Sequence, residues 1–534
     1  MTKGGKEEDD AAYRLRVYGD NDEQRNGSFR TFSKRISKRM SSTFLRRKSS
    51  FAESLPDSPS GWSLLTCAIL SHILAYEFNL QRRLTQRPVS FGQIPKDSLI
   101  EKIYRKLTKV LDDDILSRKI QPSLLIGTRG VCSSSMAYVK RKASPSKRKY
   151  VRFREIVTMS QDGARIALDW EFERISDDDN CRKKEILEGG IRNPVVILLH
   201  GINNDASFGY MKSLSRAFAN MGYTSVSMNF RGAGGVKLNT PRGYNGAYTG
   251  DLRSVVRQIS ARLKQGIRIF LVGSSLGANI LTKFLGEEGI MNTLPSCVSG
   301  AAGLSNPLLI DSNIVKFPVN ILMALGVKKM YLENLKSLYS MKDANSKEVL
   351  RKSFLAPTIA AIDNFSAPTF IRNDTRYPFG IKFGYKNGDE YWYDASSYHY
   401  IRHISVPFLN LTAQDDFLAR NASRNKIGYC LSNPNVIHVE TLCGGHLGWQ
   451  ETLPHKTFGA SSWADVAVSD FFRAIMSVHD DEAPTKFSKE SKCTDDADKF
   501  DYPEPFISRE EMEKDLIQVK MNAMKFTKHN HSKL

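Results

Sequence analysis

Residue types that together can activate a hydroxyl group occur in a defined order along this chain. Ser275 is the central residue of the pentapeptide 273–277, GSSLG, which has the pattern G-x-S-x-G. An apolar run at 269–272 precedes this pentapeptide and a helix-like run at 278–286 follows it, so the segment reads as a sharp strand-to-helix turn. Such a turn presents its central serine as a nucleophile, and its glycines avoid collisions with the adjoining elements. Five residues alone would also fit an ordinary Gly/Ser turn, so the partners of Ser275 decide the interpretation.

An acid and a base follow further along the chain. The apolar run 406–411 leads to Asp415 and Asp416, and His446 comes after another apolar segment at 436–439. A histidine can take the proton of a serine hydroxyl as general base, and a carboxylate fixes the tautomer of its ring. The chain order serine, acid, histidine therefore predicts a catalytic triad.

The turn after the apolar run 195–199 predicts the donors that such a triad needs for a developing oxyanion. This run ends in His200 and Gly201, and we expect the backbone N–H groups of Ile202 and Leu276 to form the oxyanion hole. His200 also begins an H-x-x-x-x-D string that ends at Asp205, a pattern associated with some acyltransferases. Its position at the predicted oxyanion turn makes that match a coincidence.

The elements that must position these residues alternate between strand and helix. Fully apolar runs are typical of parallel strands that are covered on both faces. The alternation of such runs with helices therefore predicts an α/β fold with a mostly parallel, doubly wound sheet. The interval 305–405 breaks the rhythm with apolar helix-like pieces and an aromatic-rich stretch, and is predicted to be an inserted cap that shapes the pocket. The expected strands are 195–199, 224–229, 268–272, 406–411 and 436–439; the expected helices are 208–221, 250–264 and 278–286, with 317–325 and 330–338 in the cap.

Motifs spread from about residue 150 to about residue 477 resemble the type-4 family of the AB-hydrolase superfamily, the medium-chain esterase, lipase and acyltransferase branch. They include Asp162-Gly163, Leu168-Asp169-Trp170, His200-Gly201, Asn229-Phe230-Arg231-Gly232, Thr240-Pro241-Arg242-Gly243-Tyr244, Asp251-Leu252, Gly273 to Asn279, Ser305-Asn306-Pro307, Gly384-Tyr385, Tyr391-Trp392-Tyr393, Ala395-Ser396, Asp415-Asp416 and Gly445-His446.

The resemblance implies an α/β-hydrolase fold and assigns the triad acid to Asp416, with Asp415 as the alternative. Two departures from the family pattern affect loop shape. The turn after His-Gly usually has a second glycine, where this chain has Asn203-Asn204-Asp205, and the acid motif often continues Asp-Asp-Pro-Phe, where this chain has Asp-Asp-Phe-Leu. Neither departure removes a catalytic group, but both bear on substrate preference.

Length and composition indicate one catalytic domain with long extensions. The chain has 534 residues, of which 41% are hydrophobic, and seven cysteines. The cysteines are odd in number, irregularly spaced and without a C-x-x-C pair, which argues against a disulfide framework or a zinc site and favours a cytosol-facing protein. No cofactor or metal is expected. We divide the chain into a leader (1–60), an apolar segment (61–80), an extension (81–149), the catalytic domain (150–478) and a charged tail (479–534).

The net charge of +20 is concentrated before the catalytic domain, because residues 1–154 hold 32 Lys and Arg against 15 Asp and Glu. Between residues 25 and 50 an apolar residue recurs every three or four positions among basic ones. This pattern predicts either a basic amphipathic helix on an anionic membrane surface or a solvated basic arm. The segment 61–80 is a possible membrane anchor, with an interfacial segment or a helix packed on the hydrolase as alternatives. Nucleic-acid binding is not expected, since no recognised module accompanies the charge.

These residues predict a membrane-associated serine hydrolase of carboxylic esters, of lipid or medium-chain acyl character, that works through an acyl-enzyme. An acyltransferase with the same triad and an alcohol acceptor is one alternative. A membrane-tethered interaction protein with an inactive hydrolase fold is another, against which the triad argues.

Overall fold

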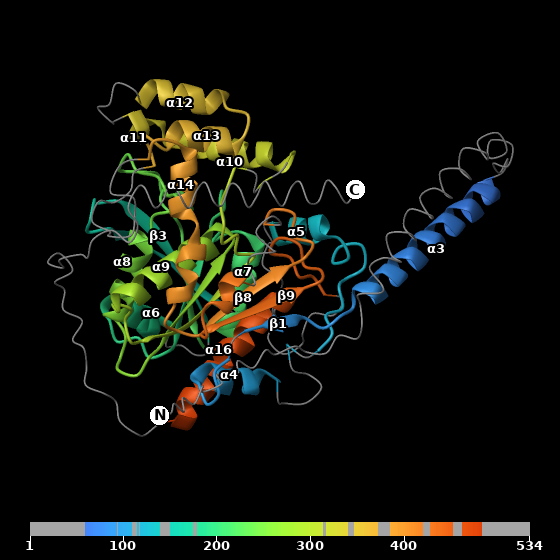
Figure 1. Ribbon diagram of the computed structural model, residues 1–534, viewed down its shortest axis with the longest axis horizontal. Helices are drawn as coiled ribbons and strands as arrows, with labels where there is room; N and C mark the ends of the chain where they lie inside the picture. Colours follow the sequence, from blue (N-terminus) through green and yellow to red (C-terminus); the bar gives the residue numbers. More distant parts are fainter. Residues whose placement is uncertain are drawn as a thin grey trace, which may run out of the picture.

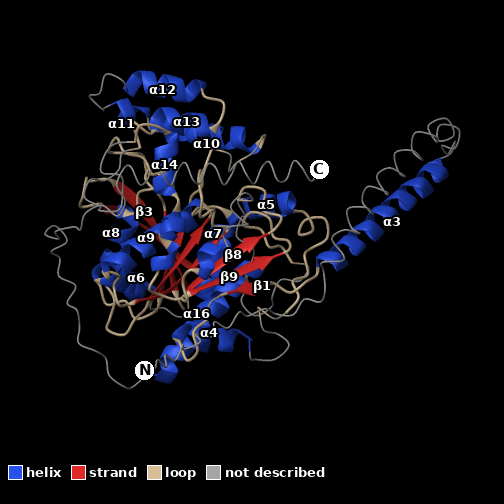
Figure 2. Cartoon of the chain, in the orientation of Figure 1, coloured by secondary structure: helices blue, strands red, loops and turns tan. Residues whose placement is uncertain are grey.

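The computed structural model describes residues 59–482, apart from 93, 109–114, 117, 139–149, 175–178, 313–314, 316, 340–345, 372–384, 420–427 and 452–461. Its centre is a nine-stranded sheet with the order β1-β9-β8-β7-β6-β4-β5-β3-β2 (Figure 2). The middle six strands pair in parallel, and the strands at both margins pair antiparallel. The strands are β1 (Val89–Phe91), β2 (Tyr150–Thr158), β3 (Arg165–Glu173), β4 (Val195–Leu199), β5 (Thr224–Met228), β6 (Ile269–Ser274), β7 (Val298–Leu304), β8 (Phe408–Ala413) and β9 (Val436–Thr441).

The parallel strands are buried almost along their whole length because helices cover both faces of the sheet. Along β4, Val196 and Leu198 point into one core cluster, and Val195 and Ile197 into another, as the alternation of side chains along a strand requires. The first cluster includes α4 (Leu99–Thr108), α5 (Gly130–Tyr138), α7 (Gly209–Asn220) and α16 (Trp463–Glu482); the second includes α6 (Asp179–Glu188), α8 (Gly250–Ser260) and α9 (Leu276–Met291). The predicted doubly wound α/β-hydrolase sheet is confirmed.

A group of helices between β7 and β8 forms the cap, which lies at the upper end of the sheet in Figure 1. It has a hydrophobic cluster of its own, which includes Ala324, Val327 and Leu350. Residues 317–338, expected as two helical pieces, form one long helix and one short one. The cap elements are α10 (Val319–Glu333), α11 (Leu335–Tyr339), α12 (Ser346–Leu355), α13 (Ile359–Ser366), α14 (Gly388–Ala395) and the 3-10 turns η1 (Ser397–His399) and η2 (Ile401–His403).

Part of the segment 81–149, expected as an extension, belongs to the hydrolase unit itself. β1 pairs with β9 in the sheet, and Ile100, Ile103 and Leu107 of α4 lie in the same core cluster as α16. The sequence does not reveal this because β1 has only three residues and its pairing partner follows more than 300 positions later. The structural start of the unit therefore precedes the predicted boundary at residue 150.

The predicted apolar segment 61–80 lies within one helix, α3 (Pro59–Leu84), which extends away from the sheet in Figure 1. Side chains in its middle are exposed, including Ile69 and Ile73, so α3 does not pack this face on the hydrolase. Its C-terminal turns are attached, because Glu77 pairs with Arg129 and the Gln81 amide donates to the Pro122 carbonyl at 2.7 Å. Within the described ranges, no helix combines the length and the apolar character needed to cross a membrane. The predicted amphipathic leader helix and the tail after residue 482 lie outside the described residues.

Candidate active site

The elbow at Ser275 has the strained backbone that its pattern predicts. Ser275 joins β6 to α9 with φ 55° and ψ −119°, a conformation that a non-glycine residue rarely adopts. A Cβ on Gly273 would lie 2.5 Å from the Ala278 Cα, and one on Gly277 would lie 2.6 Å from the His200 carbonyl oxygen. Both neighbours are backbone atoms that cannot move aside, so the two glycines allow this turn to form.

The structure brings together the three side chains predicted to form the triad. The His446 Nε2 lies 2.8 Å from the Ser275 Oγ, and its Nδ1 lies 2.8 Å from Oδ2 and 3.0 Å from Oδ1 of Asp416. His446 and Asp416 are buried, and the Asp416 Oδ1 also accepts the backbone N–H groups of Leu418 and Ala419. These bonds fix the carboxylate beside the ring, where it favours the tautomer that carries its proton on Nδ1 and leaves Nε2 free to take the serine proton.

Asp415, the alternative acid, supports the histidine loop from another side. Its Oδ1 accepts the backbone N–H of Gly445 at 2.7 Å, and burial raises the pKa of its carboxyl group. Asp415 therefore holds the backbone next to His446, whereas Asp416 holds the ring.

The histidine loop also rests on α5, which the sequence analysis did not connect with the site. The Ser134 Oγ accepts the backbone N–H of His446 at 2.6 Å and donates to the Gly130 carbonyl at 2.7 Å. A Cβ on Gly445, which has φ 59°, would lie 2.1 Å from that same carbonyl oxygen. Ser134 stands in a run of three serines that carries no pattern of its own, so no sequence signal pointed to it.

Two buried hydroxyl groups and a neutral imidazole hold the predicted oxyanion turn. The Tyr210 hydroxyl accepts the N–H of Gly201 at 2.9 Å, and the Tyr244 hydroxyl accepts the N–H of Asn203 at 3.0 Å. The His200 Nε2 accepts the N–H of Phe230 at 3.1 Å, so its Nδ1 carries the proton that bonds to the Gly201 carbonyl at 2.7 Å. Burial lowers the pKa of His200 to about 4, and both ring nitrogens are occupied. His200 is therefore a structural group and not an acid or base for an H-x-x-x-x-D mechanism.

The predicted donors Ile202 and Leu276 lie on the two turns that flank the serine. A Cβ on Gly201 would lie 3.2 Å from the Ser275 Cβ, so the turn that carries Ile202 runs directly beside the nucleophile. Leu276 is the first residue of α9, where backbone N–H groups have no acceptor within the helix. Among the described residues, no hydrogen bond occupies the N–H of Ile202 or of Leu276.

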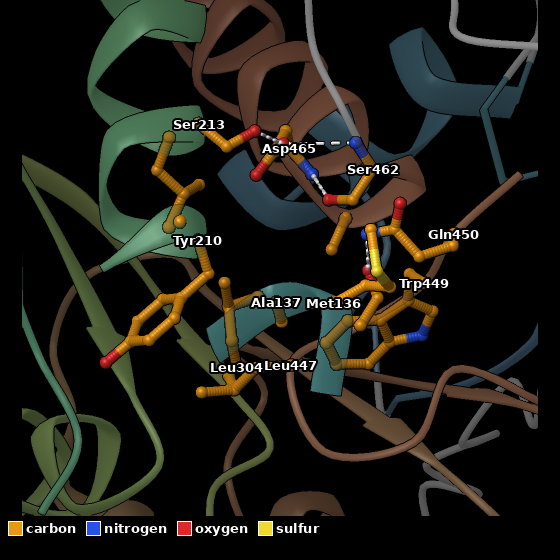
Figure 3. Close-up of a pocket in the computed structure, with 14 residues that line it drawn as sticks. Met136, Ala137, Tyr210, Ser213, Leu304, Leu447, Trp449, Gln450, Ser462 and Asp465 are labelled. Atoms are coloured by element: carbon orange, nitrogen blue, oxygen red, sulfur yellow. Dashed lines mark hydrogen bonds between the residues drawn. The ribbon is translucent and has the colours of Figure 1, made fainter. Parts of the chain in front are cut away.

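A pocket lies behind the histidine loop, between α5, α7 and α16 (Figure 3). Leu447, which follows His446, lines it together with Leu304, whose carbonyl accepts the Ser275 N–H at 2.8 Å. Asp465 pairs with Ser213 and accepts the N–H of Ser462, so it already has partners within the pocket wall. The volume of this cavity is about 20 Å³, enough for a single water molecule, so it is too small to hold an acyl chain.

Comparison with known proteins agrees with this geometry. A family model described as "alpha/beta hydrolase fold" matches residues 194–449, which contain the serine, the acid and the histidine. The stretch 194–449 thus matches the α/β-hydrolase fold, in agreement with the sheet described above. It is 30% identical over 328 residues to the embryogenesis-associated protein EMB8 of Picea glauca, covering 60% of this chain and 66% of that protein.

Two other relatives of this chain carry names that state an activity. A monoacylglycerol lipase of Saccharomyces cerevisiae is 30% identical over 266 residues, covering 48% of this chain and 55% of the lipase. Phospholipase ABHD3 of Bos taurus is 26% identical over 326 residues, covering 61% of this chain and 72% of the phospholipase. The chain thus spans less than two thirds of the length of the spruce and yeast proteins.

Several motif residues of this chain prove to be buried structural links. Arg231 is fully buried and pairs with Asp251 through two bonds of 2.6 Å and with Asp162 through bonds of 2.5 and 3.1 Å. Every charge in this cluster has a partner, and removing one partner would leave an uncompensated buried charge. The pKa of Arg231 is raised as a result of its two carboxylate partners, which outweigh its desolvation.

The helix that follows the nucleophile is tied to the cap by polar side chains. The Asn279 amide donates to the Ala395 carbonyl at 2.6 Å, and the Lys283 ammonium group lies 2.6 Å from the Asp394 carboxylate. In the part of the chain that the structure describes, no group of three His, Cys, Asp or Glu side chains could hold a metal ion.

Proposed function

We propose that this chain is a serine hydrolase of carboxylic esters, with lipid or medium-chain acyl esters as its substrates. The observation that carries the proposal is the pair of short contacts of His446, with the Ser275 hydroxyl on one nitrogen and the Asp416 carboxylate on the other. The names of the yeast lipase and the bovine phospholipase support lipid esters as the substrate class. The sequence motifs described above support the type-4 branch as the part of the superfamily to which the chain would belong.

In the proposed mechanism, the Ser275 oxygen attacks the acyl carbon while its proton passes to the His446 Nε2. The negative charge on the former carbonyl oxygen is stabilised by the N–H groups of Ile202 and Leu276. Collapse of this intermediate breaks the bond to the alcohol, which leaves with the proton from His446, and an ester of Ser275 remains. His446 then removes a proton from water, which attacks that ester, and the carboxylic acid and free Ser275 are released. Asp416 stabilises the imidazolium in both halves.

The basic leader supports attachment to an anionic membrane surface on the cytosolic side. Its charge would add about 1 kcal/mol for each basic residue near such a surface. The exposed apolar face of α3 follows the leader directly and extends the same contact.

The activity is tested with 1-monooleoylglycerol and with p-nitrophenyl esters of increasing chain length, using the wild type and Ser275→Ala. We expect hydrolysis by the wild type and a loss of at least a thousandfold in Ser275→Ala. Ser274→Ala is the matched control, because Ser274 is the buried neighbour of the nucleophile and its hydroxyl has no hydrogen bond to any described residue. Equal activity in wild type and Ser275→Ala would contradict the mechanism. Transfer of the acyl group to an added alcohol, in preference to water, would favour the acyltransferase alternative.

A further inference from the structure

The outer face of α10 carries apolar side chains that have no covering in the described structure. Leu322 and Leu325 expose 64% and 55% of their surface, and Phe317, just before the helix, exposes 78%. Ile321 and Leu332 are exposed as well, and with Leu322 and Leu325 they follow helical spacing along one face of α10, while Val327 on the opposite face is buried in the cap. This side of α10 is therefore an apolar stripe in contact with solvent, which we call the α10 stripe.

The helix that carries the α10 stripe lies directly against the oxyanion turn. The Asn203 amide donates to the Met323 carbonyl at 2.9 Å, and a Cβ on Gly326 would lie 2.3 Å from the Asn203 Nδ2. A side chain at this position would therefore force the Asn203 amide away from its place against the helix. The α10 stripe thus lies on the outer side of α10, and the same helix contacts Asn203, the residue next to Ile202.

Basic side chains accompany the α10 stripe. The helices α10, α11 and α12 carry six lysines and arginines against two glutamates in their described residues. Lys329 and Lys336 are exposed, the former on α10 itself. Lys329 pairs with Glu333, and Arg351 and Lys352 share Glu348, which still leaves an excess of basic groups on these helices. An apolar stripe on helices with a positive net charge matches a lipid surface with anionic headgroups.

The size of the stripe also favours a lipid surface over a protein. With Phe317, its five side chains expose on the order of 500 Å², less than the roughly 800 Å² that each partner contributes to a stable complex. Binding to a lipid surface does not require a contact area of that size, because a few inserted apolar side chains suffice when electrostatic attraction to anionic lipids is added.

We propose that the α10 stripe rests on an anionic lipid surface and brings the catalytic site to ester substrates held in that surface. The proposal rests on the proposed ester hydrolysis, which it deepens by naming where the substrate is met. In this arrangement α10 lies between the lipid surface and the oxyanion turn, to which it is hydrogen-bonded.

The test compares full-length wild type with the double variant Leu322→Ser/Leu325→Ser. Two rates are measured: hydrolysis of soluble p-nitrophenyl butyrate, and hydrolysis of 1-monooleoylglycerol in vesicles of phosphatidylcholine and phosphatidylserine. We expect the ratio of vesicle rate to soluble rate to fall at least tenfold in the double variant, with the soluble rate unchanged. The matched control is Ile156→Ser/Leu187→Ser, which removes two exposed apolar side chains from β2 and α6; its ratio should equal that of the wild type.

An unchanged ratio in Leu322→Ser/Leu325→Ser would overturn the proposal, and so would an equal fall in the control. A wild-type dimer that becomes a monomer in the double variant, seen by sedimentation, would overturn it in favour of a second copy of the chain. If the wild type hydrolyses neither ester, the proposed function fails separately. In that case, flotation with the same vesicles tests lipid binding by the α10 stripe without relying on activity. Weaker flotation of the double variant than of the wild type supports lipid binding, and equal flotation contradicts it.

Discussion

At the scale of single residues, the two adjacent aspartates after β8 have different tasks. Asp416 contacts the His446 ring, and Asp415 holds the backbone of Gly445. We predict that Asp416→Asn lowers kcat for ester hydrolysis about 10⁴-fold, because an amide favours the wrong tautomer of the histidine. Asp415→Asn keeps an oxygen that can accept the Gly445 N–H, so its kcat should stay within about tenfold of the wild type. Steady-state kinetics of both variants checks this, and a larger loss in Asp415→Asn would reverse the assignment.

Ser134 is a positioning residue, since it bonds the His446 backbone and not the substrate. Ser134→Ala leaves that buried N–H without its partner, at a cost of about 1–3 kcal/mol, and lets the imidazole shift. We expect kcat to fall about tenfold with little change in KM. Ser135→Ala is the matched control, because the Ser135 hydroxyl donates only to the Val131 carbonyl on the exposed side of the same helix. A rise in KM with unchanged kcat would show that Ser134 acts on substrate binding instead.

At the scale of elements, Asn203 joins the cap to the oxyanion turn. It lies in the turn after His200-Gly201, adopts φ 61°, and uses its amide to bond α10. Asn203→Gly keeps this backbone conformation without strain but removes the bond, so the turn that carries Ile202 becomes less fixed. We expect kcat to fall several-fold.

The matched control for Asn203→Gly is Asn292→Gly, a change at another left-handed asparagine, which ends α9 with φ 54°. Thermal unfolding measured beside the kinetics separates the two effects. Both variants should change the melting temperature by similar small amounts, and only Asn203→Gly should lower kcat. An equal loss of kcat in the two variants would contradict a specific link between cap and oxyanion turn.

At the scale of the whole molecule, the hydrolase unit begins well before residue 150. A chain that starts at residue 150 lacks β1, leaves the β9 edge unpaired and removes Ser134 from the histidine loop. We predict that this chain is insoluble or at least a hundredfold less active. A chain that starts at residue 59 retains these contacts and should hydrolyse a soluble ester at the wild-type rate. Equal activity of the two truncated chains would show that residues 59–149 are dispensable.

The sequence predicts the site better than it predicts the surroundings of the site. Ser275, Asp416 and His446 each follow an apolar run, and the carboxyl ends of parallel strands meet at one edge of the sheet, so their convergence could be inferred. The contact of Ser134 with His446 spans 312 positions and leaves no local pattern. The break between α10 and α11 also depends on a contact between distant parts of the chain. The Asn334 side chain at that point accepts the Leu238 N–H at 2.7 Å.

The central claim is that Ser275 is a nucleophile activated by His446, and its most direct test is covalent labelling with a fluorophosphonate. The reagent forms a stable bond only with a serine whose hydroxyl is activated. The account predicts one labelled peptide, the one that contains Ser275, in the wild type, and no labelling in Ser275→Ala or His446→Ala. Failure of the folded wild type to react, or equal labelling of Ser275→Ala, would contradict it.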